Sequence, residues 1–264
     1  RIYGPNTTYN LKVTEIPSAS KRPFASFELV PPLKGSDISK LYNSIAPLME
    51  FAPPFLNITS HRDEIEYQSN PDGSFRRVTV TKRPGTVAIA AAIMKEFKVE
   101  VVPHVICGGQ TIEQVENILV DLNFLGIENI MALREIKRMN KGEYLDSSIK
   151  NAVPTSFCIG AAGYPEKHCE APNLKEDIEH LKTKVEAGAG YIVTQMFFNN
   201  QSYFNFVKEC RDAGIRVPII PGIKPISTKK HIELLPRAFS IDLPEDLISE
   251  TNKCKDNKEI YRVG

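Results

Sequence analysis

A single carboxylate, Glu28, stands inside the otherwise apolar run of residues 24–30. Placing an ionisable group in a buried strand is costly unless the group is paired or used, because burial disfavours its charged form. One interpretation is a structural carboxylate that bonds to a neighbouring strand or closes an ion pair. The other is a general acid whose pKa is raised by its apolar neighbours Phe27 and Leu29. Position alone favours neither interpretation.

Further polar or small residues stand late in other apolar runs, where chemistry is expected if these runs are parallel strands of a barrel. They are Thr59 with Ser60, His104, Ala161, Ala162, Tyr164, Thr194 and Gln195. A lone histidine in a strand, such as His104, is more often a hydrogen-bonded core group than a ligand. The histidines of the chain show no spacing typical of a metal site, so no metal is expected.

Charge and missing motifs argue against several function classes. The formal net charge is +1, which argues against nucleic-acid and membrane partners. Neither a G-x-S-x-G elbow nor a Walker sequence is present, so hydrolase and P-loop chemistry have no support. The basic segment 76–83 is most simply a solvated loop, and the alternative is an electrostatic contact for an anionic ligand tail.

The cysteines and the hydropathy pattern indicate a cytoplasmic protein. The 5 cysteines are scattered and form no C-x-x-C pair, which suits free thiols in a reducing compartment. No apolar run approaches the roughly 20 residues that span a bilayer, and none opens the chain as a signal peptide would.

Short apolar runs alternate with longer amphipathic stretches, the pattern of repeated βα units. Strands are predicted at 24–30, 55–59, 99–106, 129–133, 157–162, 191–197 and 217–223, with a last one at 260–263. Helices are predicted after Asp37 and Thr111 as N-caps, after Pro84 at position N1, and at 173–187, 202–213 and 229–255, the last broken near Pro236 and restarting at Pro244. A polar loop is expected at 60–83.

Length and topology favour a single α/β domain spanning residues 1–264, a (β/α)8 TIM barrel. The chain has 264 residues, close to the roughly 250 typical of this fold. A doubly wound sheet is the alternative for parallel βα repeats. The number of strands and the absence of G-x-G-x-x-G after any strand favour the barrel.

An ordered series of short motifs resembles the methylenetetrahydrofolate reductase family over almost the whole chain. The motifs are Phe27-Glu28-Leu29-Val30-Pro31-Pro32, Asn57-Ile58-Thr59, Pro103-His104-Val105-Ile106-Cys107, Ala132-Leu133-Arg134, Tyr164-Pro165-Glu166-Lys167-His168, Lys184-Val185-Glu186-Ala187-Gly188-Ala189, Thr194-Gln195-Met196-Phe197-Phe198 and Ile219-Ile220-Pro221-Gly222-Ile223-Lys224-Pro225. Each motif alone is weak, whereas the series in this order is highly specific.

The resemblance implies a barrel that binds FAD without a Rossmann motif. The residues implied to contact the flavin cofactor are Thr59, His104, Arg134, Ala162, Tyr164, His168, Asp177 and Lys184. A carboxylate at Asp177 suits the ribityl or ribose hydroxyls, which can donate to it. Arg134, His168 and Lys184 offer hydrogen-bond donors for phosphate oxygens or for the electron-rich edge of the flavin ring. Gln195 would lie beside the substrate pterin.

The implied reaction is a ping-pong reduction of 5,10-methylenetetrahydrofolate to 5-methyltetrahydrofolate, a step of one-carbon metabolism that serves methionine biosynthesis. NADH or NADPH reduces the flavin and leaves, and the folate then takes its place. Glu28 would be the general acid that protonates N10 and opens the five-membered ring, and hydride transfer yields the methyl group. The expected partners are therefore the folate and a nicotinamide dinucleotide, and a homo-oligomer is expected. The sequence does not decide between NADH and NADPH.

The chain departs from the family pattern after Arg134. The family has A-L-R-G-D, whereas Arg134 is followed here by Glu135-Ile136-Lys137, and Glu135 is out of register by one. Residues absent from the chain after Arg134 and before Ile260 would explain this departure and the short helix expected before the last strand. A truly shortened chain would instead have an open barrel.

Two rival functions remain at this point. One is another flavin-dependent barrel oxidoreductase, similar to proline dehydrogenase, which would lack the folate-opening acid. The other is a flavin- or folate-binding barrel that has lost catalysis with the missing aspartate. Oxidation of reduced nicotinamide with an artificial acceptor separates the binding protein from both enzymes, and folate-dependent turnover separates the two enzymes.

Overall fold

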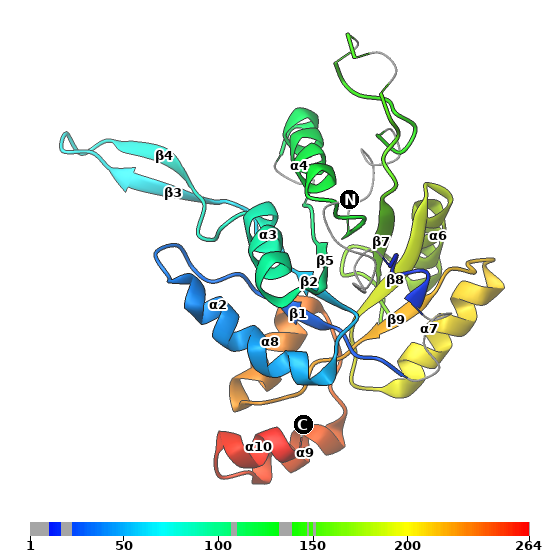
Figure 1. Cartoon of the computed structure of the whole chain (residues 1–264). Coiled ribbons are helices and arrows are strands. Elements are labelled where there is room, and N and C mark those ends of the chain that lie inside the picture. Colours follow the sequence, from blue (N-terminus) through cyan, green and yellow to red (C-terminus); the bar gives the residue numbers. More distant parts are fainter. Residues whose placement is uncertain are drawn as a thin grey trace. The chain divides into compact units, whose positions relative to one another are not determined.

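A computed structural model describes residues 11–16, 23–106, 110–131, 139–146, 148–149 and 152–263. The chain divides between Ile159 and Gly160 into two compact units, of which the first ends at Ile159 and the second begins at Gly160. The ribbon in Figure 1 is coloured along the sequence, so unit 1 runs from blue to green and unit 2 from green to red. Each unit is described separately below.

Unit 1 is built on parallel strands covered by helices. The strands are β1 (Phe27–Leu29), β2 (Phe55–Ile58) and β5 (Glu100–Pro103), paired in the order β1-β2-β5, with β6 (Asn129–Met131) following in the chain. A parallel bridge joins His104 to Met131. The helices are α2 (Ile38–Ile45), the 3-10 helix η1 (Ala46–Phe51), α3 (Thr86–Phe97) and α4 (Ile112–Phe124).

Side-chain hydrogen bonds start two of these helices where the sequence predicts them. Asp37 accepts a hydrogen bond from the Ser39 amide at the N-terminus of α2. Thr111 and Gln114 form a reciprocal capping box at the start of α4. The expectation for Pro84 is wrong by two positions, because Gly85 is the N-cap of α3 and Thr86 its first residue.

The two faces of the unit 1 sheet differ in polarity. Leu29, Leu56, Ile58 and Val101 lie in one core cluster with buried side chains of α3 and α4. Successive side chains of a strand point to opposite faces. Glu28 is in register with Asn57, and Asn57 with Val102, so these residues occupy the face turned away from the helices.

A buried polar cluster ties the start of the described chain to unit 1. The Asn129 side chain accepts a hydrogen bond from the Val13 amide at 2.8 Å and donates to the Leu11 carbonyl and to Glu100 Oε1, both at 3.0 Å. Asn129 is fully buried and Glu100 is 3% exposed. Both residues therefore depend on one another for hydrogen bonds that water cannot supply.

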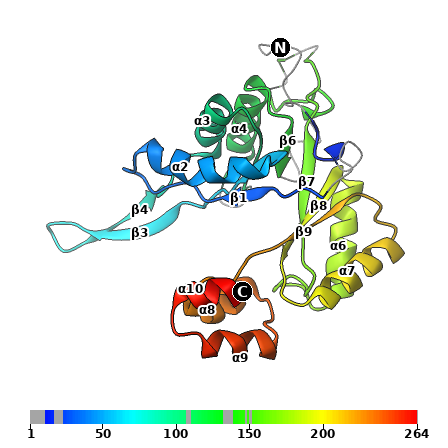
Figure 2. The ribbon, with the colours of Figure 1, turned by 60° about the horizontal axis from the view of Figure 1, so that its bottom comes forward.

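The predicted polar loop at 60–83 is wrong, because the segment forms a β-hairpin. Strands β3 (Glu64–Ser69) and β4 (Phe75–Val80) pair antiparallel from Glu64 with Val80 to Ser69 with Phe75. Apolar and polar residues alternate with period 2 along 64–69, a strand signal hidden by the high charge of the segment. Asn70, Asp72 and Gly73 supply the turn chemistry, with Gly73 at φ 82°. Figures 1 and 2 show the hairpin extending away from α2 and α3.

Unit 2 continues the alternation of strands and helices. Its strands are β7 (Cys158–Gly163), which crosses the division of the chain, β8 (Ala189–Met196) and β9 (Ile219–Gly222), adjacent in that order, with β8 and β9 parallel. Its helices are α6 (Leu174–Glu186), α7 (Asn200–Asp212), α8 (Lys229–Phe239), α9 (Glu245–Lys253) and α10 (Asn257–Val263). A Cβ added at Gly222 would lie 2.2 Å from the Thr194 carbonyl oxygen, so only glycine allows β9 to approach β8 this closely.

Two predictions for the end of the chain are wrong. Residues 260–263 belong to helix α10 rather than to a strand, because Asp256 accepts hydrogen bonds from the amides of Lys258 and Glu259 and starts a helix there. Ile260 is fully buried in a small core with residues of α8 and α9, and Figure 2 shows these helices grouped together. The break expected near Pro236 falls instead after Phe239, where Ser240 ends α8 in the left-handed conformation.

The hydrogen bonds of the Asn129 cluster are expected to contribute to the stability of the folded chain. We expect Asn129→Ala to lower the free energy of unfolding by about 1–3 kcal/mol, because Glu100 and the Val13 amide lose a buried partner. Urea unfolding followed by circular dichroism measures the change. Asn205→Ala, at an exposed position of α7, is the control and should stay within about 0.5 kcal/mol of the parent. Equal losses in both variants would contradict a structural role for the cluster.

Candidate active site

In unit 1, three of the predicted site residues share the face of the sheet that is turned away from the helices. Thr59 and His104 follow β2 and β5 directly, and their backbone amides still donate within the sheet, to the carbonyls of Leu29 and Ile58. Glu28 lies on the same face in β1 through its register with Asn57. The structure thus brings Glu28, Thr59 and His104 to one face near the C-terminal ends of parallel strands, where barrel enzymes hold their substrates.

The His104 side chain has one buried nitrogen atom. Its Nε2 atom has no hydrogen-bond partner within the described part of the chain. Burial lowers the pKa of His104 to about 4, so the ring is neutral at pH 7. A buried polar atom without a partner costs about 1–3 kcal/mol, which favours the interpretation of His104 as a ligand-binding group over that of a satisfied core histidine.

Asn57 adds a second group of this kind, which the sequence analysis named only as part of a motif. Its Oδ1 atom is buried and lacks a hydrogen-bond partner among the described residues, while its Nδ2 donates to Ser26 Oγ at 3.4 Å. Thr59 donates its hydroxyl to the Leu29 carbonyl at 3.0 Å, and the Glu28 side chain is exposed. The face therefore offers a carboxyl group, an amide oxygen and an imidazole.

In unit 2, Asp177 organises a second set of predicted residues. Asp177 is 8% exposed at the start of α6, and its Oδ2 accepts a hydrogen bond from the His168 amide at 2.9 Å. The rings of Tyr164 and His168 pack edge to face with centroids 4.7 Å apart. Burial, and then the negative charge of Asp177, raise the pKa of Tyr164.

Lys184 lies two turns further along α6, on the same side as Asp177. Burial lowers the pKa of Lys184, and Asp177 opposes that shift. A partly desolvated ammonium close to a buried carboxylate offers a hydrogen-bond donor to an anionic or hydroxylated ligand. Asp177, Tyr164, His168 and Lys184 thus form one group of interacting side chains, called the electrostatic group of unit 2 below.

A β-bulge displaces Gln195 from the regular ladder of β8. The pairing of β8 with β9 shifts register between Val193 and Met196. The Thr194 hydroxyl accepts a hydrogen bond from the Gly222 amide at 2.9 Å. Gln195 Oε1 accepts a hydrogen bond from the backbone amide of Met196 at 2.9 Å, which holds the Gln195 side chain in place. Bulges commonly re-aim side chains next to active sites. Ala162, in β7, is half-buried.

Arg134 and the departure at Glu135 lie outside the described residues. Within the described ranges, no three or more His, Cys, Asp or Glu side chains are grouped in a way that could hold a metal ion. No helix in these ranges is long and apolar enough to cross a membrane. The cysteines within these ranges, Cys158, Cys169, Cys210 and Cys254, are all free thiols.

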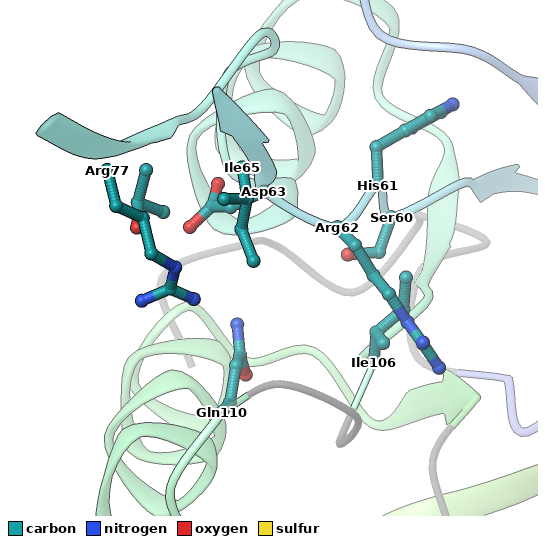
Figure 3. A pocket seen from close by; sticks show the side chains of 9 residues that line it. Ser60, His61, Arg62, Asp63, Ile65, Arg77, Ile106 and Gln110 are labelled. Carbon is teal, nitrogen blue, oxygen red and sulfur yellow. The ribbon is translucent and has the colours of Figure 1, made fainter. Parts of the chain in front are cut away.

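A pocket that the sequence analysis missed lies where the β3–β4 hairpin joins unit 1 (Figure 3). It has a volume of about 260 Å³ and is lined by Ser60, His61, Arg62, Asp63, Ile65, Arg77, Thr79, Ile106 and Gln110. Ser60 follows Thr59 after β2 and Ile106 lies two residues beyond His104 after β5, whereas Ile65, Arg77 and Thr79 belong to the hairpin. The sequence analysis predicts a solvated loop here, with a contact for an anionic ligand tail as the alternative, and names no pocket because the hairpin that forms its wall is not predicted.

The comparisons with known proteins agree on one family. The family model described as methylenetetrahydrofolate reductase matches residues 12–263. The 5,10-methylenetetrahydrofolate reductase of Escherichia coli (strain K12) is 33% identical over 242 residues, which are 90% of this chain and 76% of that protein.

Two longer eukaryotic relatives match over a similar part of the chain. The probable methylenetetrahydrofolate reductase (NADPH) of Caenorhabditis elegans is 28% identical, over 92% of this chain. The methylenetetrahydrofolate reductase (NADH) 1 of Arabidopsis thaliana is 29% identical, over 90% of this chain. The chain spans only 37% and 41% of the length of these two relatives.

A solved structure of an uncharacterized Clostridium thermocellum protein that binds two copies of 5-methyl-5,6,7,8-tetrahydrofolic acid is also similar. It has a TM-score of 0.55 at 15% identity and covers 90% of this chain and 81% of that one. Likeness at this level shows a common fold. With the alternating parallel strands and helices, it confirms the predicted fold class, an α/β protein of the β/α-barrel kind.

The lowered pKa of His104 predicts a pH dependence of stability. The unfolded chain takes up a proton on this residue below about pH 6.5, whereas the native chain does so only near pH 4. Stability should therefore fall as the pH drops from 6.5 to 4. The drop in unfolding free energy between pH 7 and 5 should be smaller in His104→Asn than in the parent. An NMR titration of the His104 ring with a midpoint near 6.5 would contradict the burial argument.

Proposed function

The chain belongs to the methylenetetrahydrofolate reductase family, and on this basis we propose that it reduces 5,10-methylenetetrahydrofolate to 5-methyltetrahydrofolate with NADH or NADPH, using bound FAD. The observation that carries the proposal is the family match over residues 12–263, with Glu28, Thr59 and His104 gathered on one polar face of unit 1. The names of the relatives include both nicotinamide forms, so the donor is proposed only as a reduced nicotinamide dinucleotide.

We infer that Glu28 is the proton donor of the reaction. Opening of the five-membered ring of the folate needs a proton at N10, and an acid within hydrogen-bond reach lowers the barrier to this step. The Glu28 side chain is exposed, and its position in β1 holds it near the C-terminal edge of the sheet. Gln195 would contact the pterin, whose alternating donors and acceptors match a side-chain amide.

The chemistry of the residues that the resemblance implies for the cofactor supports the proposal of FAD. Among the described residues, His104 Nε2 has no hydrogen-bond partner, so a polar atom of the cofactor could bind there. Lys184 is half-buried and its ammonium offers hydrogen-bond donors. Asp177 has the acceptor capacity for ribityl or ribose hydroxyls, with Thr59, Ala162, Tyr164 and His168 as further contacts. Arg134 is proposed as a phosphate contact on the resemblance alone. When bound, the flavin supplies the hydride chemistry that no protein side chain can perform.

The proposal also places the protein in the cytoplasm, in agreement with the free thiols of the described cysteines. We further propose that residues 1–264 form a single domain. We also propose that the protein is a homo-oligomer. Light scattering of the purified chain measures the assembly directly.

An anaerobic spectrum tests the function as a whole. The purified chain, supplied with FAD, should show flavin absorbance, lose it on addition of NADH or NADPH, and regain it on addition of methylenetetrahydrofolate. Bleaching without recovery would favour a different flavin enzyme, and failure to take up FAD would contradict the proposal.

Removal of the proposed acid should separate the two half-reactions. We expect Glu28→Gln to keep flavin binding and oxidation of reduced nicotinamide with an artificial acceptor. Folate reduction should fall by about 10²–10⁴-fold, because acid catalysis is lost while the shape of the side chain is retained. Glu96→Gln, at an exposed position of α3, is the control. Folate turnover of Glu28→Gln equal to that of the control would remove Glu28 from the mechanism.

The electrostatic group of unit 2 should set the affinity for the flavin. We expect Lys184→Met to raise the Kd for FAD by about 10–100-fold, as loss of a charge-assisted hydrogen bond would. Lys175→Met removes an exposed lysine from the same helix and should change the Kd less than about 2-fold. Fluorescence quenching of titrated FAD gives both values. A flavin affinity unchanged by Lys184→Met would show that the ammonium does not contact the cofactor.

A further inference from the structure

One wall of the pocket at the base of the hairpin is formed by side chains of β3 and β4. In the pairing of β3 with β4, Ile65 is opposite Thr79 and Tyr67 is opposite Arg77. Opposite residues of an antiparallel pair share one face of the ribbon. Ile65, Thr79 and Arg77 line the pocket, whereas Arg76 is not among the lining residues and donates a hydrogen bond to Gln68 on the other face.

The other cations of this segment are already engaged. Lys82 forms ion pairs with Glu64 and Glu66, and Arg83 donates to the Pro31 carbonyl. Burial, and then the charge of Arg83, lower the pKa of His61, which favours its neutral form. Within the described ranges, no ion pair to a carboxylate engages Arg62 or Arg77. The pocket therefore holds two guanidinium groups against one carboxylate, that of Asp63.

The side chains are arranged around a space rather than collapsed onto one another. Figure 3 shows the Arg77 guanidinium and the Gln110 amide directed toward each other from the hairpin and from the segment before α4. Arg62 extends on the side of Ile106. Guanidinium and amide N–H groups bind carboxylate or phosphate oxygens in a fork, and the isoleucines offer a small apolar surface beside them.

From this arrangement we propose that the hairpin pocket binds the oxyanionic end of a ligand whose reacting part lies at the polar face of unit 1. The inference rests on the proposed function, since it adds a binding region to the same edge of the sheet. A volume of about 260 Å³ holds a carboxylate- or phosphate-bearing end, and it is below the range of roughly 300–1,000 Å³ typical for a whole drug-sized ligand. The oxyanion is either a glutamate carboxylate of the folate or a phosphate of the nicotinamide dinucleotide.

The matched variants Arg77→Gln and Arg76→Gln test the proposal, because they remove the same charge from adjacent residues on opposite faces of the hairpin. Isothermal titration of the full chain would use NADH, NADPH, and 5-methyltetrahydrofolate with one or three glutamates. Arg77→Gln should raise the Kd of at least one ligand by about 10-fold, and Arg76→Gln should change it less than about 2-fold. A loss larger for NADPH than for NADH assigns the 2′-phosphate, and an equal loss for the two dinucleotides alone assigns their pyrophosphate. A loss larger for the triglutamate assigns the folate tail. Circular dichroism confirms that both variants are folded.

Two simple probes separate this inference from the function itself. Tripolyphosphate and tri-γ-glutamate carry the oxyanions without a reactive centre. Binding of either probe that is lost in Arg77→Gln but kept in Arg76→Gln would support the pocket even if the chain reduced no folate. Normal folate reduction together with equal ligand and probe affinities in both variants would overturn the pocket and leave the proposed function intact.

Discussion

Side-chain alternation along the short parallel strands of unit 1 decides where polar groups can lie. Leu29, Ile58 and Val101 must face the helices, because they form the core with α3 and α4. The residues between them are then forced onto the other face, whatever their chemistry. Glu28 and His104 reach that face through this constraint alone. A shift of one residue in register would bury Glu28 among aliphatic side chains and expose the core.

The outcome of sequence reasoning depended on how local each signal is. Caps at Asp37 and Thr111 were predictable because a helix start is written in a few adjacent residues. The polar positions Glu28, Thr59 and His104 were predictable because they interrupt apolar runs. The family resemblance added Asp177 and Lys184, which lie on a helix of ordinary composition and carry no signal of their own.

The wrong predictions arise where a local signal is outweighed by another pattern or where a feature depends on distant neighbours. Strands β3 and β4 were missed because charge was given more weight than period, although Ile65 and Tyr67 alternate with polar residues. The expected number of strands favours a strand at 260–263, whereas the local signal, a cap at Asp256, indicates a helix. The unpartnered atoms of Asn57 and His104 could not be predicted, because the lack of a partner depends on every neighbour in three dimensions.

The closed turn of the hairpin has a practical consequence. Asn70 and Ser74 bond to each other through backbone and side chain, and Asp72 caps the same turn. The tip thus supplies hydrogen bonds for its own backbone, and its residues are solvent-exposed or half-buried. Such a turn is a suitable place to insert a short peptide tag or reporter. A reporter at this turn would be attached to the same hairpin as Arg77. It could therefore report ligand binding at the base of the hairpin without altering the core.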